Sequence, residues 1–333
     1  MEQPKPYSAG TQGRVRSLFR HENAALLLVL LALIFGIGGM TRGGSLGLTN
    51  ASNVLLQSSI RGIAAIGQAF VILTAGIDVS VGGNALFCSV LGAALLTSSE
   101  RNIIGHPLPL ALGVLIVIVA GLGWGTVNSA LVSRVGIPAL IATLGMWQIT
   151  DGAAFEIIQG FSIGDLPEHL AWWGQGTVGV VPVPVIIYVV VAIVAYYVLN
   201  YTTYGRSIYA TGGNPVSAWL SGINVKQVLF SVYAISGFLA GLAAFIQLGR
   251  VMSASMMGLE GLEIDSIAAV TIGGVSLFGG RGNLIGVILG TLIIGTVNNG
   301  LSVLKAAPAA IRIVKGAIII LAVAIDTVRR RRS

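Results

Sequence analysis

The amino-acid sequence predicts an all-α, polytopic membrane protein of about ten transmembrane helices with an inverted-topology internal repeat. The first observation is composition: of 333 residues, 55% are hydrophobic and only 9% are charged, and the mean hydropathy is +0.89. Soluble domains carry about 25% charged residues, so a water-soluble globular protein is excluded. The other two observations are a series of apolar stretches of span length and a pair of similar segments in opposite orientations.

The same composition excludes several kinds of site. The net charge is +7, but the basic residues cluster at the termini and do not alternate with aromatic residues, so no nucleic-acid partner is expected. The single Cys88 excludes an internal disulfide, and three scattered histidines lack metal-ligand spacing. No lysine lies in a phosphate-binding loop of the GxxxxGKS or GxxxxGKT type. We therefore expect no nucleotide site, cofactor, metal or catalytic residue in this chain, and no enzyme activity of its own.

A bilayer core about 30 Å thick requires about 20 apolar residues per helix. Ten stretches of the sequence fit this template: 24–40, 54–75, 84–99, 108–132, 138–159, 181–200, 227–249, 266–280, 284–303 and 307–325. The first has no convincing cleavage site after it and is interpreted as a retained anchor. The stretch 266–280 is short and glycine-rich, which favours a broken or half-crossing segment. The expected organisation is an N-terminal segment 1–23, one transmembrane domain over 24–327 and a basic tail over 328–333.

Basic residues indicate the orientation, because cytoplasmic loops are enriched in Lys and Arg. Ten crossings with the N-terminus inside put twelve basic residues in the cytoplasm: Lys5, Arg14, Arg16, Arg20, Arg134, Arg206, Lys226, Arg281 and Arg329 to Arg332. Four fall outside: Arg42, Arg101, Arg250 and Lys305. This split predicts that both termini are cytoplasmic.

Two segments match at an offset of 170 residues. GTVNSALVSRVGIPALI at 125–141 and GTVNNGLSVLKAAPAAI at 295–311 are identical at eight of 17 positions. In the ten-span topology the first copy runs inward and the second outward, which is the inverted repeat of alternating-access transporters. Chance similarity between two Gly/Val-rich helices is the alternative. Asn128 and Asn298 occupy equivalent positions, where they either hydrogen-bond between helices or support the substrate route.

The string ILTAGIDVSVGGN at 72–84 is typical of a junction between two helices. Gly76, Gly82 and Gly83 permit the backbone angles of such a junction. Asp78 or Ser80 is expected to accept hydrogen bonds from the first turn of the next helix. The junction is either a cap at the cytoplasmic interface or part of the substrate route.

Five ionisable residues lie within predicted spans, where each costs about 2.5 kcal/mol or more at the bilayer centre: Arg61, Asp151, Glu156, Arg312 and Lys315. Arg312 and Lys315 share a helix face near the outer end of their span, and we expect them to snorkel to the interface. Arg61 is expected either to pair with Asp151 or Glu156 or to line the route.

The loop 202–227 contains start and stop signals for one short helix. Asn214 is a good N-cap, Pro215 suits the first helical position, and Gly222 suits the residue past the end. A helix over 215–221 is therefore predicted between two spans. It either rests on lipid or docks to another protein, and Ser217 and Ser221 share one of its faces.

Four strings together resemble one known family. They are GIDVSVGG at 76–83, the GTVN to LGM stretch at 125–146, YGRSIYATGGNPVSAWLSGI at 204–223, and IAAVTIGGVSLFGGRGN with the GTVNNGLSVL that follows at 267–304. The sequence resembles the membrane permease subunits of bacterial ABC importers of the ribose, xylose and galactose type, and more distantly the branched-chain amino acid permeases. The match covers nine of the ten predicted spans in order.

This resemblance implies a permease of the bacterial inner membrane that forms a homo- or heterodimer. It also implies a separate ABC subunit that binds ATP and magnesium, and a periplasmic solute-binding protein. The substrate would be a monosaccharide or a similar small polar solute. An ion-coupled secondary transporter, with Asp151 and Glu156 as its ion site, is the alternative.

The resemblance assigns the loop 201–226 to ATPase coupling. Its expected coupling residues are Gly205, Arg206, Gly213, Asn214, Pro215, Leu220, Ser221 and Gly222. For the translocation route, the polar residues expected within or beside the spans are Gln57, Arg61, Gln68, Asp78, Asn128, Asp151 and Asn298. The route is expected to be mostly apolar and to bind its solute weakly.

The predicted topology is testable by cysteine labelling. Single cysteines at Ser333 and at Glu168, in a Cys88-free background, should react with a membrane-impermeant thiol reagent from the cytoplasmic and the periplasmic side, respectively, because an even number of crossings separates the tail from the N-terminus. Labelling of both positions from one side would contradict the ten-span topology.

Overall fold

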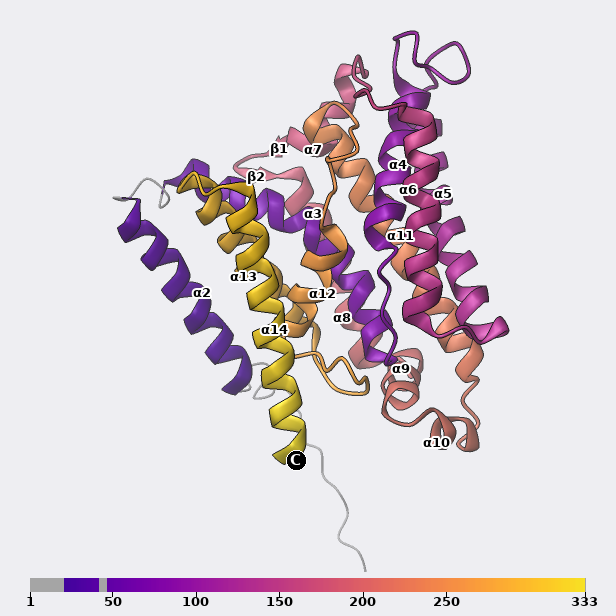
Figure 1. Ribbon diagram of the computed structural model, residues 1–333, viewed down its shortest axis with the longest axis vertical. Helices are drawn as coiled ribbons and strands as arrows, with labels where there is room; N and C mark the ends of the chain where they lie inside the picture. Colours follow the sequence, from indigo (N-terminus) through magenta and orange to yellow (C-terminus); the bar gives the residue numbers. More distant parts are fainter. Residues whose placement is uncertain (1–20, 42–46, 333) are drawn as a thin grey trace, which may run out of the picture.

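The computed structural model describes residues 21–41 and 47–332, which form an all-α bundle (Figure 1). The longer helices are α2 (His21–Met40), α3 (Leu48–Leu73), α4 (Val81–Leu96), α5 (Leu110–Ala130), α6 (Ala139–Ile158), α8 (Val183–Tyr201), α11 (Val225–Val251), α13 (Leu284–Val303) and α14 (Pro308–Arg332). The shorter elements are the π-helical turn Leu131–Val135, the 3-10 turn Glu168–Leu170, α7 (Ala171–Gln175), β1 (Thr177–Val178), β2 (Val181–Pro182), α9 (Thr203–Gly213), α10 (Pro215–Leu220) and α12 (Leu262–Ile272).

Six helices among the described residues are long and apolar enough to cross a membrane: α2, α3, α5, α8, α11 and α13. The protein is therefore a multi-pass, all-α membrane protein. The 16-residue α4 is a shorter apolar helix. At about 1.5 Å per residue, the 11-residue α12 is only about 16 Å long, far short of the 30 Å hydrocarbon core. Its length agrees with a half-crossing segment.

The predicted stretches coincide with helices, with differences at their ends. α14 continues to Arg332, so residues 328–332 of the expected basic tail belong to this helix and do not form a separate segment. The N-terminal segment 1–23 lies mostly outside the described residues, as does Ser333. α9 was not predicted as a helix: Thr202 caps its first turn by accepting a hydrogen bond from the Gly205 N–H at 3.1 Å.

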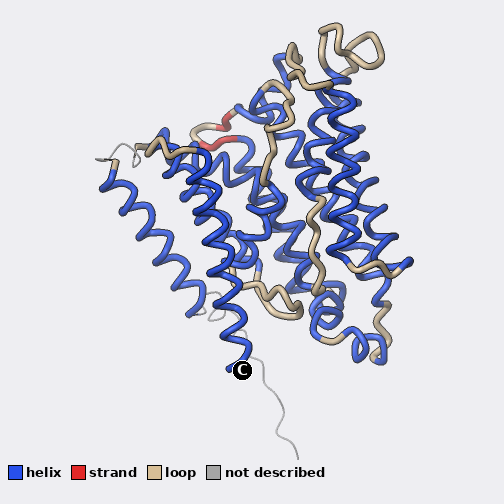
Figure 2. Tube along the Cα trace, viewed as in Figure 1, coloured by secondary structure: helices blue, strands red, loops and turns tan. Residues whose placement is uncertain are grey.

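Two long helices are each followed by a break and a short helix. Residues 74–80 connect α3 to α4, and residues 252–261 connect α11 to α12. Figure 2 shows both breaks as loop segments running through the bundle. The first break packs among α3, α5, α6 and α11. In the second, Ala254 and Ile163 exchange two backbone hydrogen bonds, at 2.9 and 3.0 Å.

The helix α11 is central and packs against α5, α3 and α4. Glycines allow its close approach to α5: Gly121 and Gly125 on α5 face Gly237 and Gly241 on α11. A Cβ added at Gly125 would lie 2.6 Å from the Tyr233 carbonyl oxygen. Such four-residue spacing of small residues lets two membrane helices bring their backbones together.

This interface gives a stability prediction with a control on the same helix. Gly125→Ala should lower the free energy of unfolding by about 1 to 3 kcal/mol, because the added methyl overpacks the α5–α11 contact. Gly123→Ala should cause no loss, because a Cβ there meets nothing within 4 Å. Thermal unfolding of the detergent-solubilised protein measures both, and equal melting temperatures would contradict the packing described.

Candidate functional site

The first break is organised around Asp78, which is buried at 2% exposure. Its Oδ1 accepts hydrogen bonds from the Ser80 N–H at 3.0 Å and from the Ser80 hydroxyl at 2.6 Å. Its Oδ2 accepts from the Ser236 hydroxyl of α11 at 2.8 Å. One side chain thus connects the start of α4 to α11. The expected cap of the α4 first turn is not formed, since neither Asp78 nor Ser80 reaches those N–H groups.

Two further predicted residues complete this network. With its amide oriented to satisfy both ends, Gln68 of α3 donates to the Asp78 carbonyl at 3.0 Å and accepts from the Asp78 N–H at 3.2 Å. Asn128 of α5 donates to the Ser80 hydroxyl at 2.6 Å. Three helices, α3, α5 and α11, therefore supply the polar partners that an unwound segment requires inside a membrane. The network is buried, so it holds the break in place and leaves little room for a ligand.

The two short helices meet at their first turns. A Cβ added at Gly82 of α4 would clash with the Glu263 carboxylate of α12, so this glycine makes space for that side chain. The positive ends of two helix dipoles are thereby close together, with Glu263 and Asp265 in the first turn of α12. Such convergence of half-helices is typical of substrate regions in membrane transporters.

A second polar cluster is centred on Asp265, which is also 2% exposed. Its Oδ2 accepts from Arg61 Nε of α3 at 2.9 Å and from Asn298 Nδ2 of α13 at 3.1 Å. Its Oδ1 lies 2.9 Å from Lys315 Nζ of α14. One carboxylate therefore serves two cations and ties α12 to three other helices.

The cluster corrects two expectations. Arg61 pairs with Asp265 and not with Asp151 or Glu156, and no salt bridge to these two acids is found among the described residues. Lys315 does not snorkel, since its side chain is 19% exposed and bonded to Asp265. Its neighbour Arg312 is 70% exposed and pairs with Glu260 at 2.7 Å, which agrees with the expected interfacial position. The partner that the sequence did not single out is Asp265, which lies one residue before the predicted stretch 266–280.

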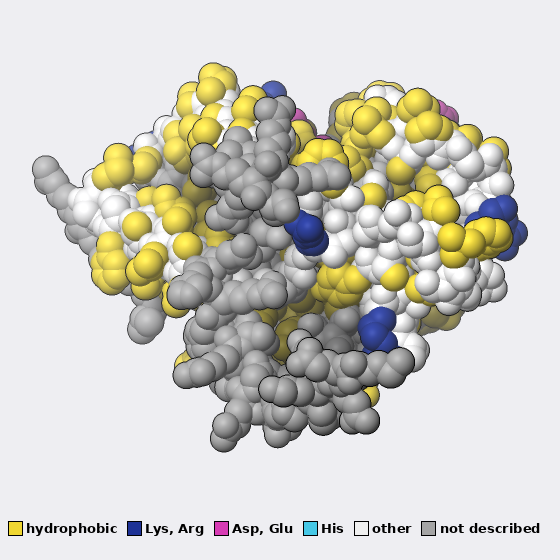
Figure 3. Space-filling model, turned by 90° about the horizontal axis from the view of Figure 1, so that it is seen from below, with side chains coloured by type: hydrophobic (Ala, Val, Ile, Leu, Met, Phe, Trp, Pro, Cys, Tyr) yellow, Lys and Arg dark blue, Asp and Glu magenta, His cyan; other side chains and the backbone are white. Residues whose placement is uncertain are grey.

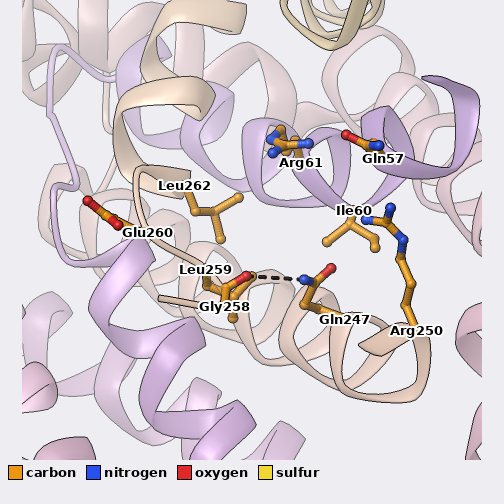
Figure 4. A pocket seen from close by; sticks show the side chains of 9 residues that line it. All are labelled: Gln57, Ile60, Arg61, Gln247, Arg250, Gly258, Leu259, Glu260 and Leu262. Atoms are coloured by element: carbon orange, nitrogen blue, oxygen red, sulfur yellow. Dashed lines mark hydrogen bonds between the residues drawn. The ribbon is translucent and has the colours of Figure 1, made fainter. Parts of the chain in front are cut away.

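Next to this cluster lies a small pocket between α3 and α11 (Figure 4). We call it the α3–α11 pocket; its volume is about 50 Å³. It is lined by Gln57, Ile60, Arg61, Gln247, Arg250, Gly258, Leu259, Glu260 and Leu262. Gln247 Nε2 donates to the Gly258 carbonyl at 3.1 Å and so fixes the second break against α11. Two of the predicted route residues, Gln57 and Arg61, thus line a pocket together, while Arg250 and Gln247 were not predicted.

The predicted route residues therefore occupy three separate places. Gln57 and Arg61 line the pocket, and Asn298 joins them through Asp265. Gln68, Asp78 and Asn128 form the buried network of the first break. Asp151 lies half-buried on α6, and the structure does not bring it to either cluster.

The short helix between two spans is present as α10. The Asn214 side chain accepts a hydrogen bond from the Ser217 N–H at 3.0 Å, and Pro215 is the first helical residue. Gly222 has a φ of +84°, which is the left-handed conformation that glycine favours after a helix. The predicted caps are confirmed, although the helix ends at Leu220. The side chains of Val216, Trp219 and Leu220 are exposed, so α10 presents an apolar face.

The helix before α10, α9, is held by contacts with two other parts of the bundle. A Cβ added at Gly212 would clash with the Leu73 carbonyl, the last residue of α3, and the Gly280 N–H donates to that same carbonyl at 2.9 Å. The Tyr209 hydroxyl donates to the Gly282 carbonyl at 3.1 Å. Burial raises the pKa of Tyr209 above its ordinary value, so the hydroxyl stays protonated. α9 is therefore joined to the end of α3 and to the loop before α13.

The face that carries α10 is basic. Seen from this side, the coloured charged groups are mainly Lys and Arg, with Asp and Glu near the edge (Figure 3). Arg134, Arg206, Lys226 and Arg281 are the exposed basic residues expected there. Arg206 and Leu220 of the predicted coupling set are exposed, whereas Gly205 is buried where a Cβ would meet the Leu199 carbonyl.

Comparisons with known proteins place the chain among permease components. Residues 50–323 match the model of the family described as branched-chain amino acid transport system / permease component. The chain is 36% identical over 313 residues to the ribose import permease protein RbsC of Escherichia coli K12, covering 93% of this chain and 94% of the relative. It is 36% identical over 318 residues to the fructose import permease protein FrcC of Rhizobium meliloti (92% and 86% covered). It is 35% identical over 303 residues to the D-allose transport system permease protein AlsC of Escherichia coli K12 (89% of each). No solved structure gives a significant match.

The Asp265 cluster predicts a large difference between two carboxamide substitutions. Asp265→Asn should lower the free energy of unfolding by about 3 kcal/mol, because it leaves two poorly exposed cations without their anion. Glu260→Gln should cost less than about 1 kcal/mol, because its pair with Arg312 is exposed. Thermal unfolding in detergent compares the two variants, and a Glu260→Gln loss as large as that of Asp265→Asn would refute this assignment.

Proposed function

This chain belongs to the permease-component family of the branched-chain amino acid transport system, and from that premise we propose a specific role for it. It is the transmembrane subunit of an ATP-binding cassette importer in a bacterial inner membrane. Its solute is a monosaccharide or a similar small polar molecule, as the names of its sugar-permease relatives suggest. Energy comes from a separate subunit that binds ATP and magnesium, and this chain holds no cofactor.

The observation that carries the proposal is α10 together with these relatives. A capped helix with an exposed apolar face on a basic surface suits a docking element for another protein. The ion-coupled alternative has less support: Asp151 and Glu156 form no described ion pair, and Glu156 is exposed on α6.

We further propose ten crossings within one domain over 24–327, arranged as an inverted repeat. α3, its break and α4 correspond to α11, its break and α12, and α5 and α13 carry the matching GTVN strings. Each copy then continues into a helix that starts at a proline, with Pro138 as the N-cap of α6 and Pro308 as the first residue of α14. The contact between the first turns of α4 and α12 supports a route near the middle of the bundle.

The orientation and partners follow from the same proposal. Both termini and α10 face the cytoplasm, where the exposed basic residues on the α10 face agree with the positive-inside rule. The ATPase binds at α10, a periplasmic solute-binding protein binds at the opposite face, and a second permease copy completes the complex.

The contacts of α9 suggest how a push on α10 reaches the route. α9 is packed against the last residue of α3 through Gly212 and is bonded to the loop before α13 through Tyr209. The break after α3 begins at the next residue, Thr74. A rigid displacement of α9 and α10 would therefore move the base of α3 and shift the network around Asp78. That network connects the start of α4 to α3, α5 and α11.

The coupling role of α10 is tested by removing its caps. Asn214→Ala deletes a cap worth about 1 kcal/mol, and Gly222→Val disfavours the left-handed conformation at its end. The double variant should insert normally and reach normal abundance, yet lose uptake and binding-protein-stimulated ATP hydrolysis in reconstituted vesicles.

The matched control is Asn200→Ala. Asn200 is an exposed asparagine at the end of α8 whose side chain donates to the Tyr196 carbonyl, so this variant should keep uptake and stimulated hydrolysis. Full stimulated hydrolysis and uptake by the double variant would show that α10 is not the coupling element.

A further inference from the structure

The α3–α11 pocket contains a guanidinium group with no anionic partner among the residues that the structure describes. Arg250 lies in the last turn of α11 and is half-buried. It makes no salt bridge or side-chain hydrogen bond with any residue in the described part of the chain. A partly desolvated cation without a counter-charge is unfavourable, so this arrangement needs a reason.

Arg61 adds to the positive charge of the same pocket. Among the described residues only its Nε is bonded, to Asp265, so within that part of the chain its two terminal nitrogens are available as donors. Asp265 also neutralises Lys315, so one negative charge is shared between two positive ones. Arg61 lies close enough to Arg250 for the two guanidinium groups to repel each other.

The acids near the pocket do not compensate for these two guanidinium groups. Glu260 lies on the opposite side of the pocket from Arg250 (Figure 4) and pairs with Arg312. The Glu263 carboxylate is directed against Gly82 of α4. The Arg250 side of the pocket therefore has an excess of positive charge.

The polar groups and the size of the pocket indicate what fits there. Figure 4 shows the side chain of Gln57 close to the guanidinium end of Arg250 and on the same side of the pocket as Arg61. One ordered water needs about 10–15 Å³, so about 50 Å³ holds a few waters or one ionised group but not a whole sugar ring. Guanidinium groups bind carboxylates with two parallel hydrogen bonds, and the amide can bond a neighbouring hydroxyl.

We propose that the α3–α11 pocket binds the carboxylate of a polyhydroxylated solute, with Arg250 and Arg61 as its anion-binding residues and Gln57 as a hydroxyl partner. The transported solutes would then include sugar acids. This inference rests on the proposed importer function and narrows its substrate class.

The charge of the pocket is tested with a thiol probe in the reconstituted importer, without the solute-binding protein. A Gln57→Cys, Cys88→Ser chain is treated with two methanethiosulfonates, one carrying a sulfonate and one a trimethylammonium group. The anionic reagent should react about tenfold faster than the cationic one. Arg250→Gln should reduce the ratio of the anionic to the cationic labelling rate several-fold, whereas Arg250→Lys should preserve it. Arg101→Gln, a charge change outside the pocket, should leave the ratio unchanged. A ratio that does not respond to Arg250→Gln would overturn the proposal.

Ligand specificity is tested by protection of the same cysteine. D-galacturonate should slow the labelling of this cysteine when position 250 is the native Arg250 or carries Arg250→Lys, and should not slow it in the Arg250→Gln variant. D-galactose, which lacks the carboxylate, should not protect the cysteine in any of these chains. Equal protection by both sugars would overturn the proposal. If the docked solute-binding protein protects the cysteine and galacturonate does not, the proposal is also overturned, because the carboxylate bound in the pocket would then belong to the solute-binding protein and not to the solute. Uptake and stimulated ATP hydrolysis by the unsubstituted chain, reconstituted with the solute-binding protein, report on the importer function independently of these outcomes.

Discussion

The constraint on which the rest of the structure depends is that a helix broken inside a membrane must have its freed backbone and polar groups satisfied within the protein. The chain breaks twice, after α3 and after α11, and meets this requirement with side chains from distant helices. At the first break, the Asp78 carboxylate accepts hydrogen bonds from Ser80 and Ser236. For the second break the partners are the Ile163 backbone and Gln247. Both breaks are thus fixed to α11, the first through Ser236 and the second through Gln247.

This requirement also explains why the bundle is packed so closely where the breaks lie. Side chains such as Asn128 and Ser236 reach the first break only if α5 and α11 approach it together, and the facing glycines of these two helices allow that approach. Packing and polar satisfaction therefore depend on one another. A change that separated α5 from α11 would also remove the hydrogen bonds that hold Asp78, so the break is coupled to the most extensive helix contact of the molecule.

The sequence predicted the parts of the fold that follow from local chemistry. The span positions follow from runs of apolar residues, and the caps of α10 follow from Asn214, Pro215 and Gly222, which interact within a few residues. It did not predict the partner of Arg61, because Asp265 is 204 residues away and no periodic pattern encodes which acid a buried arginine meets. α9 was missed for a related reason: its short, glycine-containing sequence is weakly helical alone, and its contacts with Leu73 and Gly282 come from the tertiary structure.

The shared carboxylate of Asp265 has a consequence for how the two ends of the molecule communicate. Its partners come from α3, α13 and α14, while α3 also ends at the contact with α9. α3 therefore carries Arg61 of the charge cluster near its middle and the α9 contact at its C-terminal end, with Gln68, which is bonded to the break, between them. Because a helix transmits displacement along its axis more readily than a loop does, a movement at the base of α3 would alter the distance between Arg61 and Asp265. The charge available in the adjoining pocket would then depend on the position of α9 and α10.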